Sequence, residues 1–281
     1  MENVVELKRE ETIPHRPVSL GFIGWGMFGQ GLQSLQRTEN SSRHQKGWIF
    51  PLDDLPEESN GWKIVLDLDH LFSRANVIFV DAAYEDLKLL FPRIRLLVSD
   101  SHLLVFLGAD VSFKKISEQI TERKVIRCLV SPVRRFLDIS LVFAASQMVS
   151  AQELEQFFQV LDGLPVVLEV DSESQLEALQ GLISTGPAIG YSIIDALADG
   201  ALKMQIPRKT GLLLAAHVLF GAARTFLESE IHPGVLRDQS ITQKGIPLSG
   251  LVSLEKSGFR GSIVQAIEEA ANEAQKKSRS E

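Results

Sequence analysis

Short apolar runs recur through the first 170 residues and alternate with segments of helical length. The run at 18–23 leads into a glycine-rich turn, and residues 30–37 then support a helix. Segments 84–99 and 112–123 also have the length and composition of helices. The other apolar runs, which we predict to be strands, are 47–50, 64–66, 77–80, 103–107, 124–130 and 141–145. Strands that alternate with helices predict a mainly parallel sheet with helices on its faces.

The pattern changes after residue 170, where Ala, Leu, Glu and Gln recur at helical spacing. A long helix is predicted over 185–203, ending near Gln205 because Pro207 follows it. A second helix is predicted over about 209–227 and a third over 261–277. We therefore predict an α/β Rossmann-type N-terminal domain followed by an all-α C-terminal domain. The predicted boundaries are a tail at 1–16, the nucleotide-binding domain at 17–170 and the helical domain at 171–281, with a polar loop at 38–46.

Composition narrows the function classes. The 281 residues are 44% hydrophobic and 23% charged, as in ordinary globular proteins. The net charge of -7, without a dense basic stripe, argues against nucleic acid as a partner. Residues 1–11 lack the apolar core of a signal peptide, and the apolar stretch 211–223 is shorter than the roughly 20 residues that span a bilayer, so we expect a cytoplasmic protein without a membrane segment.

Few side chains have the types and spacing of a metal or nucleophile site. The single cysteine, Cys128, lies in an apolar run and is predicted to be a buried small side chain without catalytic function. His217 lies in an apolar helix and His232 precedes a proline, so packing and turn formation explain both. No set of His, Cys and carboxylate residues has the spacing of metal ligands, and no metal is expected.

The candidate chemistry begins with a glycine motif between the first strand and the first helix. In a GxGxxG turn the first glycine allows the tight bend, the second lets the backbone approach a pyrophosphate, and the third allows close helix packing. The phosphate then lies at the helix N-terminus, where free N–H groups favour negative charge. We predict nucleotide binding here over a purely structural turn, through Gly24, Trp25, Gly26, Met27, Phe28 and Gly29.

The choice between NAD and NADP stays open in the sequence. An acidic residue about 20 positions after the glycines holds the ribose of NAD, whereas a basic residue favours the 2′-phosphate of NADP. Asp53 is the candidate for this acidic residue, although it comes slightly late in the sequence. It is equally explained as an exposed loop carboxylate.

A family resemblance is carried mainly by the C-terminal third. The matching segments, in order, are Thr185-Gly186-Pro187-Ala188, Asp195-Ala196-Leu197-Ala198-Asp199-Gly200, Lys203, Pro207-Arg208, Gly221-Ala222-Ala223, His232-Pro233, Leu236-Arg237-Asp238, Gly250-Leu251, Leu254-Glu255 and Gly258-Phe259-Arg260. Together with the glycine turn they resemble pyrroline-5-carboxylate reductase. The resemblance implies hydride transfer from NAD(P)H to the imine carbon of a five-membered ring, giving proline. It also implies that the helical domain forms a homodimer or a larger homo-oligomer and contributes to the substrate pocket.

The same resemblance assigns candidate site residues. Thr185 and Thr242 are expected catalytic residues. Lys244, which the family loop lacks, is added to them as a compensating charge for a substrate carboxylate, although an exposed loop lysine explains it more simply. The positions expected to bind substrate are Gly186, Pro187 and Gly245, and those expected to join the glycine turn at the cofactor are Ala82 and Ala83.

Three segments depart from the family pattern. The family's Val-Thr-Ser-Pro-Gly-Gly-Thr-Thr loop is replaced by 240–247, in which Ile246 and Pro247 remove two hydroxyls and one backbone donor. The family's Ala-Val-Lys-Pro segment is Asp81-Ala82-Ala83-Tyr84 here, and its Met-Pro-Asn-Thr-Pro segment is Leu129-Val130-Ser131-Pro132-Val133. Three functions therefore stay open: reduction of pyrroline-5-carboxylate, reduction of a different cyclic imine, or a dimeric nucleotide-binding or regulatory protein without the reaction.

Overall fold

The computed structural model describes residues 18–35, 47–52, 62–108, 110–133, 138–229, 231–241 and 246–279. Several predictions fall outside these residues: the tail at 1–16, the polar loop at 38–46, and the site residues Asp53, Thr242, Lys244 and Gly245. The chain divides into two compact units, one of residues 1–184 with 270–281 and the other of residues 185–269. The predicted domain boundary at 170/171 stays a prediction.

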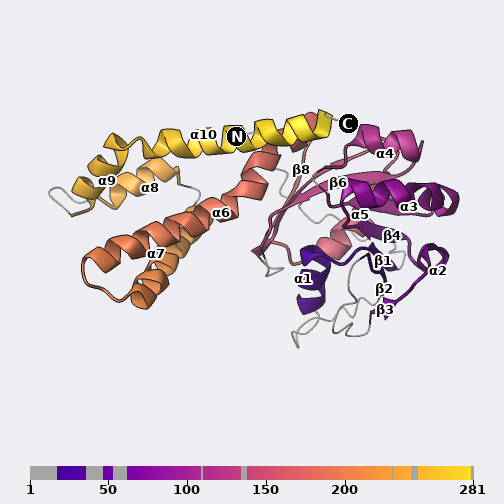
Figure 1. Cartoon of the computed structure of the whole chain (residues 1–281), viewed down its shortest axis with the longest axis horizontal. Coiled ribbons are helices and arrows are strands. Elements are labelled where there is room, and N and C mark those ends of the chain that lie inside the picture. The colour runs from indigo at the N-terminus through magenta and orange to yellow at the C-terminus, as the bar shows by residue number, and fades with distance from the viewer. Residues whose placement is uncertain are drawn as a thin grey trace. The chain divides into compact units, whose positions relative to one another are not determined.

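The first unit is built on a sheet that contains eight strands in the described part of the chain (Figure 1). Their order is β3-β2-β1-β4-β5-β6-β7-β8, and all neighbouring strands are parallel except β6 and β7. The bounds are β1 (Leu20–Ile23), β2 (Gly47–Phe50), β3 (Lys63–Ile64), β4 (Val77–Val80), β5 (Leu103–Phe106), β6 (Val125–Val130), β7 (Ser140–Ala145) and β8 (Val166–Glu169). The predicted, mainly parallel sheet is confirmed.

Helices cover both faces of this sheet, which is why β1, β4 and β5 at its centre are apolar at every position. One face packs against α1 (Met27–Leu35) and α5 (Ala151–Leu161), through side chains such as Phe28 and Phe157. The other face packs against α2 (Leu68–Arg74), α3 (Tyr84–Leu97) and α4 (Phe113–Gln119). Cys128 belongs to the first of these cores, as predicted, and burial raises the pKa of its thiol well above the usual range.

A buried ion pair joins the sheet to the first turn of α6 (Glu173–Lys203). Arg127 of β6 is 1% exposed, and its guanidinium binds the carboxylate of Glu173, which is 26% exposed. The same carboxylate accepts a 2.6 Å hydrogen bond from the backbone N–H of Phe113. Glu173 therefore connects three elements of the first unit.

The second unit is entirely helical where it is described. Besides residues 185–203 of α6 it contains α7 (Arg208–Ser229), α8 (Pro233–Gln239), α9 (Ile246–Lys256) and the first half of α10 (Phe259–Arg279). The predicted fold class, an α/β domain followed by a helical domain, is confirmed. The helix predicted at 185–203 begins twelve residues earlier, at Glu173, and α8 and α9 were not predicted.

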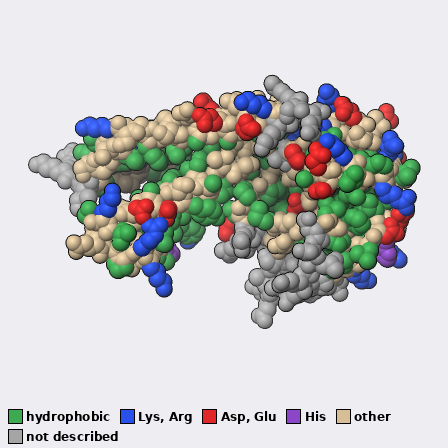
Figure 2. All heavy atoms as spheres, viewed as in Figure 1, with side chains coloured by type: hydrophobic (Ala, Val, Ile, Leu, Met, Phe, Trp, Pro, Cys, Tyr) green, Lys and Arg blue, Asp and Glu red, His purple; other side chains and the backbone are tan. Residues whose placement is uncertain are grey.

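The surface of the helical unit is unusually apolar for a single chain (Figure 2). His217 is exposed here, so its predicted packing in a core is wrong for the chain alone. The 22-residue helix α7 is long and apolar enough to cross a membrane by length and composition, which is weak evidence, because core helices of soluble proteins pass the same test. Its large exposed apolar residues are Leu213, Leu214, Val218, Phe220, Phe226 and Leu227.

Candidate nucleotide site

The strand order places a ligand position at the carboxyl ends of β1 and β4. The chain leaves β1 for β2 on one side and returns as β4 on the other side of β1. Parallel sheets bind ligands in the crevice at such a switch point, where successive connections go to opposite faces. The glycine motif that the sequence singled out lies at this position, between β1 and α1.

The backbone of the turn has the conformation that the motif predicts. Gly24 has φ +80°, in the left-handed region that favours glycine, and its N–H donates a 2.9 Å bond to the carbonyl oxygen of Phe50. A side chain at Gly24 would overlap the backbone carbonyl oxygen of Asp81. The turn is therefore held tightly against the ends of β2 and β4, and α1 follows directly after it.

The third glycine and Trp25 serve the core as well as the turn. A Cβ at Gly29 would lie 2.7 Å from the indole of Trp25, so the absent side chain makes room for this ring. The indole packs edge-on against Phe22 with 4.9 Å between ring centroids and lies 5.3 Å from Trp62. Phe28 is buried, whereas Met27 is 48% exposed. Of the predicted cofactor residues, the side chains of Trp25 and Phe28 thus contribute mainly to packing.

Asp81, which was not among the site residues predicted from the sequence, lies against the glycine turn. The carboxylate of Asp81 occupies the space next to the Cα of Gly26, where any side chain on that glycine would overlap it. It accepts a hydrogen bond from the backbone N–H of Gly26. Burial raises the pKa of the Asp81 carboxyl, and the bond from Gly26 only partly offsets this. No cation pairs with Asp81 among the described residues.

A second carboxylate lies at the ends of β4 and β5. Asp110 accepts a 3.0 Å hydrogen bond from the N–H of Tyr84, the first residue of α3, and so caps that helix. The ammonium of Lys115, a buried side chain, lies 4.5 Å from the centre of the Tyr84 ring and 3.4 Å from the carbonyl oxygen of Asp110. The predicted residues Ala82 and Ala83 lie in this connection, where Ala83 is the N-cap of α3 without a side-chain bond.

The described substrate positions lie on α6. Thr185, Gly186 and Pro187 are half-buried and follow one another inside the helix. Pro187 has no N–H to donate to the helix, and a side chain at Gly186 would meet no neighbouring atom within 4 Å. Ile246 and Pro247, which replace two threonines of the family loop, form the start of α9. Their roles in substrate binding stay predictions.

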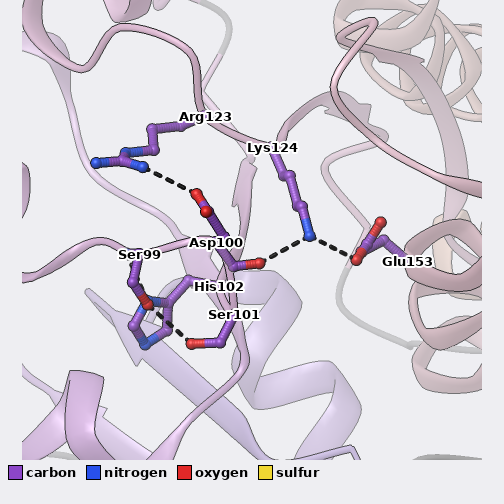
Figure 3. A network of polar contacts seen from close by, with 7 residues as sticks. All are labelled: Ser99, Asp100, Ser101, His102, Arg123, Lys124 and Glu153. Carbon is purple, nitrogen blue, oxygen red and sulfur yellow. Dashed lines mark hydrogen bonds and ion pairs between the residues drawn. The ribbon is translucent and has the colours of Figure 1, made fainter.

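A separate cluster of polar residues lies at the amino ends of β5 and β6, whereas the glycine turn lies at the carboxyl end of β1 (Figure 3). It combines Asp100 and His102, which precede β5, with Arg123 and Lys124, which precede β6. His102 accepts a 2.9 Å bond from the N–H of Ser99 at Nδ1, so its Nε2 carries the proton that is donated to the carbonyl oxygen of Phe72. Both ring nitrogens are thus used within the fold, and this cluster is structural.

Metal ligation is not supported by the described part of the chain. Within it, no three His, Cys, Asp or Glu side chains come together as a possible metal site. The left-handed Gly24, the N-terminus of α1 and the switch point fit a dinucleotide, whereas the carboxylate of Asp81 opposes one.

Comparisons with known proteins agree with this geometry. Residues 173–277 match the family model described as pyrroline-5-carboxylate reductase dimerisation, a match that indicates a homo-oligomer. Pyrroline-5-carboxylate reductase 2 of Rattus norvegicus is 28% identical over 260 residues, which cover 89% of this chain and 81% of the relative.

Two solved structures show the same fold. A pyrroline-5-carboxylate reductase from Coxiella burnetii is similar with a TM-score of 0.83 and 21% identity, covering 93% of this chain and 99% of that one. The Plasmodium falciparum pyrroline carboxylate reductase with NADP bound has a TM-score of 0.80 and 18% identity, covering 93% and 98%. The sequence matches along most of the chain, together with the matched dimerisation domain, confirm the predicted resemblance to the pyrroline-5-carboxylate reductase family.

Proposed function

We propose that the protein reduces a cyclic imine with hydride from NADPH or NADH, and that 1-pyrroline-5-carboxylate, which would give proline, is the first substrate to test. The observation that supports this most strongly is the glycine turn with a left-handed Gly24 at the switch point of the sheet, in a chain of this family. In the reaction, hydride adds to the imine carbon and a proton adds to the nitrogen.

The cofactor would supply the hydride, and the chain would bind and orient it. The backbone of Gly24, Gly26 and Met27 would hold the diphosphate at the start of α1. Ala82 and Ala83, at the end of β4, would line the same crevice. NADP is the favoured cofactor because the similar Plasmodium falciparum structure contains it. Titration of the protein with NADPH and with NADH decides between the two cofactors.

The substrate would be held by residues of the helical unit. We assign Thr185, Thr242 and Lys244 to the reacting part of the ring and Gly186, Pro187 and Gly245 to its binding. Each neutral hydrogen bond lost from such a site costs about 0.5–1.5 kcal/mol. Because Ile246 and Pro247 lack the family's two hydroxyls, we expect affinity for pyrroline-5-carboxylate to be reduced by about tenfold to a hundredfold relative to family members with the intact loop.

Steady-state cofactor consumption tests the proposal. Purified protein is mixed with NADPH or NADH and then with pyrroline-5-carboxylate or a panel of other cyclic imines of five and six ring atoms. We expect turnover of at least one imine, and a lower kcat/KM for Thr185→Val than for Thr185→Ser, which keeps the hydroxyl. If every imine stays unreduced with both cofactors, the reductase proposal is wrong.

A second function is favoured by two observations taken together. The anion position on the glycine turn is occupied by the carboxylate of Asp81, and the loop that holds the substrate in the family is altered. These features fit a dimeric regulatory protein that keeps the family fold without the reaction. Detection of any imine reduction would exclude this alternative.

A further inference from the structure

The glycine turn already holds an anion from its own chain. The second glycine of the motif leaves an open space beside its Cα, through which a pyrophosphate approaches the backbone. In this protein the carboxylate of Asp81 lies in that space, so close that a side chain on Gly26 would overlap it. Asp81 also accepts the hydrogen bond that the N–H of Gly26 has to offer.

The placement of Asp81 is fixed by the backbone on both sides. Its N–H donates a 2.9 Å bond to the carbonyl oxygen of Ile23, and its own carbonyl oxygen lies against Gly24. The Asp81 backbone therefore cannot move without disturbing β1, β4 and the turn together, and only rotation of the side chain can clear the space. No cationic side chain among the residues that the structure describes pairs with the Asp81 carboxylate.

We propose that Asp81 limits the affinity for dinucleotides by occupying the diphosphate position on the glycine turn. A dinucleotide that binds there must displace the carboxylate from Gly26 and then tolerate a negative charge beside its phosphates. Two neighbouring negative charges repel each other strongly in a partly buried site. Asp81 therefore limits binding at the cofactor site, and this inference rests on the proposed function only in taking the ligand to be a dinucleotide.

A purely structural role for Asp81 predicts different behaviour. If the carboxylate only fastens the turn, its removal should loosen the turn and weaken the binding of NADPH. If the carboxylate competes with phosphate, its removal should strengthen that binding. Two substitutions separate size from charge: Asp81→Ala clears the space, and Asp81→Asn keeps the shape and the acceptor for the Gly26 N–H but removes the charge.

The experiment is a titration of the full chain and its variants with NADPH and with NADH, followed by the intrinsic tryptophan fluorescence. Glu169→Gln is the matched control, because Glu169 is also a carboxylate whose pKa is raised by burial, and it lies on β8, four strands away from β4. Circular dichroism and the thermal midpoint of each variant establish that it is folded.

We expect Asp81→Ala to bind at least tenfold more tightly than the unaltered chain, which corresponds to about 1.4 kcal/mol. Asp81→Asn should bind more tightly as well, with an advantage that shrinks as salt is raised, because salt screens charge repulsion. Glu169→Gln should leave the affinity within about twofold, well below the tenfold that corresponds to 1.4 kcal/mol.

Equal or weaker binding by folded Asp81→Ala and Asp81→Asn overturns the inference, and so does the absence of binding in all variants. The proposed function fails in a different assay. Tighter binding by the Asp81 variants without reduction of any imine supports this inference and contradicts the reductase. Turnover by the unaltered chain, with the same cofactor affinity in the variants, supports the reductase and contradicts this inference.

Discussion

Asp81 combines two features that are costly for a carboxylate: partial burial and the absence of a cationic partner among the described residues. Its pKa is raised by burial, so the protonated form is favoured in the folded state relative to the unfolded chain. Stability from such a group is fully present below its unfolded pKa and is lost as the pH rises through the folded pKa. The folded protein should therefore gain from removal of this charge at neutral pH.

The first prediction concerns Asp81→Asn. Because asparagine is neutral at every pH and keeps an acceptor for the Gly26 N–H, the variant should have a higher thermal midpoint than the unaltered chain at pH 8. The difference should shrink as the pH falls through the raised pKa of Asp81 and vanish near the ordinary value of 3.8. Thermal unfolding of both proteins across this range measures it, and a lower midpoint for Asp81→Asn at pH 8 would contradict the assigned burial cost.

Arg127 and Glu173 supply a second prediction, because the two partners differ in access to water. Glu173→Ala leaves a fully buried guanidinium without its carboxylate, and should cost about 3 kcal/mol of stability. Arg127→Met leaves a carboxylate that is 26% exposed and keeps the N–H of Phe113, so its cost should be about 1 kcal/mol. Urea unfolding measures both, and equal costs would show that exposure does not decide the outcome.

At the scale of elements, the glycine turn illustrates what the sequence could and could not predict. The strand, turn and helix were predicted because the apolar run and the glycine spacing are local signals. The position of Asp81 depends on β1 and β4 lying side by side, which no local pattern contains. An acid directly after a predicted central strand, where the family has alanine, was the available signal.

Other elements were missed for identifiable reasons. α2 and α8 have seven residues each, too short for a helical period to stand out. Pro247 was interpreted as part of a loop, yet it is the second residue of α9, within the first turn, where proline is tolerated because no N–H is needed. Likewise His232 was assigned to a turn, and it caps α8 by accepting the N–H of Gly234 at 3.1 Å.

A third prediction compares two glycines of the turn. Gly24→Ala should be destabilising by at least about 2 kcal/mol, because φ is +80° and the new side chain would meet a backbone oxygen. The atoms nearest to a side chain at Gly26 belong to the movable carboxylate of Asp81, so the smaller cost of Gly26→Ala should be relieved when Asp81→Ala is added. Thermal midpoints of the two single glycine variants and the double variant decide this. Additive effects of Gly26→Ala and Asp81→Ala would contradict the contact.

The polar network at the amino ends of β5 and β6 supplies a fourth prediction. Lys124 donates a 2.8 Å bond to Glu153 in the first turn of α5, and Glu153 also accepts the N–H of Ser150 at 2.9 Å. Burial acts to raise the pKa of Glu153, but these bonds leave it below the usual range. A double-mutant cycle of Lys124→Met and Glu153→Gln should give a coupling of about 1 kcal/mol at pH 7. The stability from Glu153 should be lost as the pH falls through its lowered pKa, and a coupling near zero at pH 7 would refute the assignment.

At the scale of the whole molecule, the apolar surface of the helical unit needs a cover. Helices that are apolar over most of their circumference are stable in water only when another surface packs on them. The match to the family's dimerisation domain indicates a homo-oligomer, and we expect a second copy of this chain to cover the surface. The same explanation accounts for α7, which passes a membrane test on composition while few of its residues are buried in the single chain.

The fifth prediction is that Val218→Glu and Phe220→Glu, each at an exposed apolar position on α7, reduce the measured mass to that of a single chain. The control on the same helix is Lys209→Gln, which should leave the oligomer intact. Light scattering after size exclusion gives the mass, and circular dichroism shows that the helices persist. An unchanged mass in both glutamate variants would place the interface elsewhere.

The most direct test of the proposed chemistry follows the hydrogen itself. The protein is incubated with pyrroline-5-carboxylate and NADPH, or NADH, deuterated at the hydride-donating carbon, and the product is analysed by mass spectrometry. We expect proline that carries one deuterium, formed only when protein, imine and reduced cofactor are all present. Absence of deuterated product from pyrroline-5-carboxylate and from every other cyclic imine, with folded and oligomeric protein, would contradict the proposed chemistry.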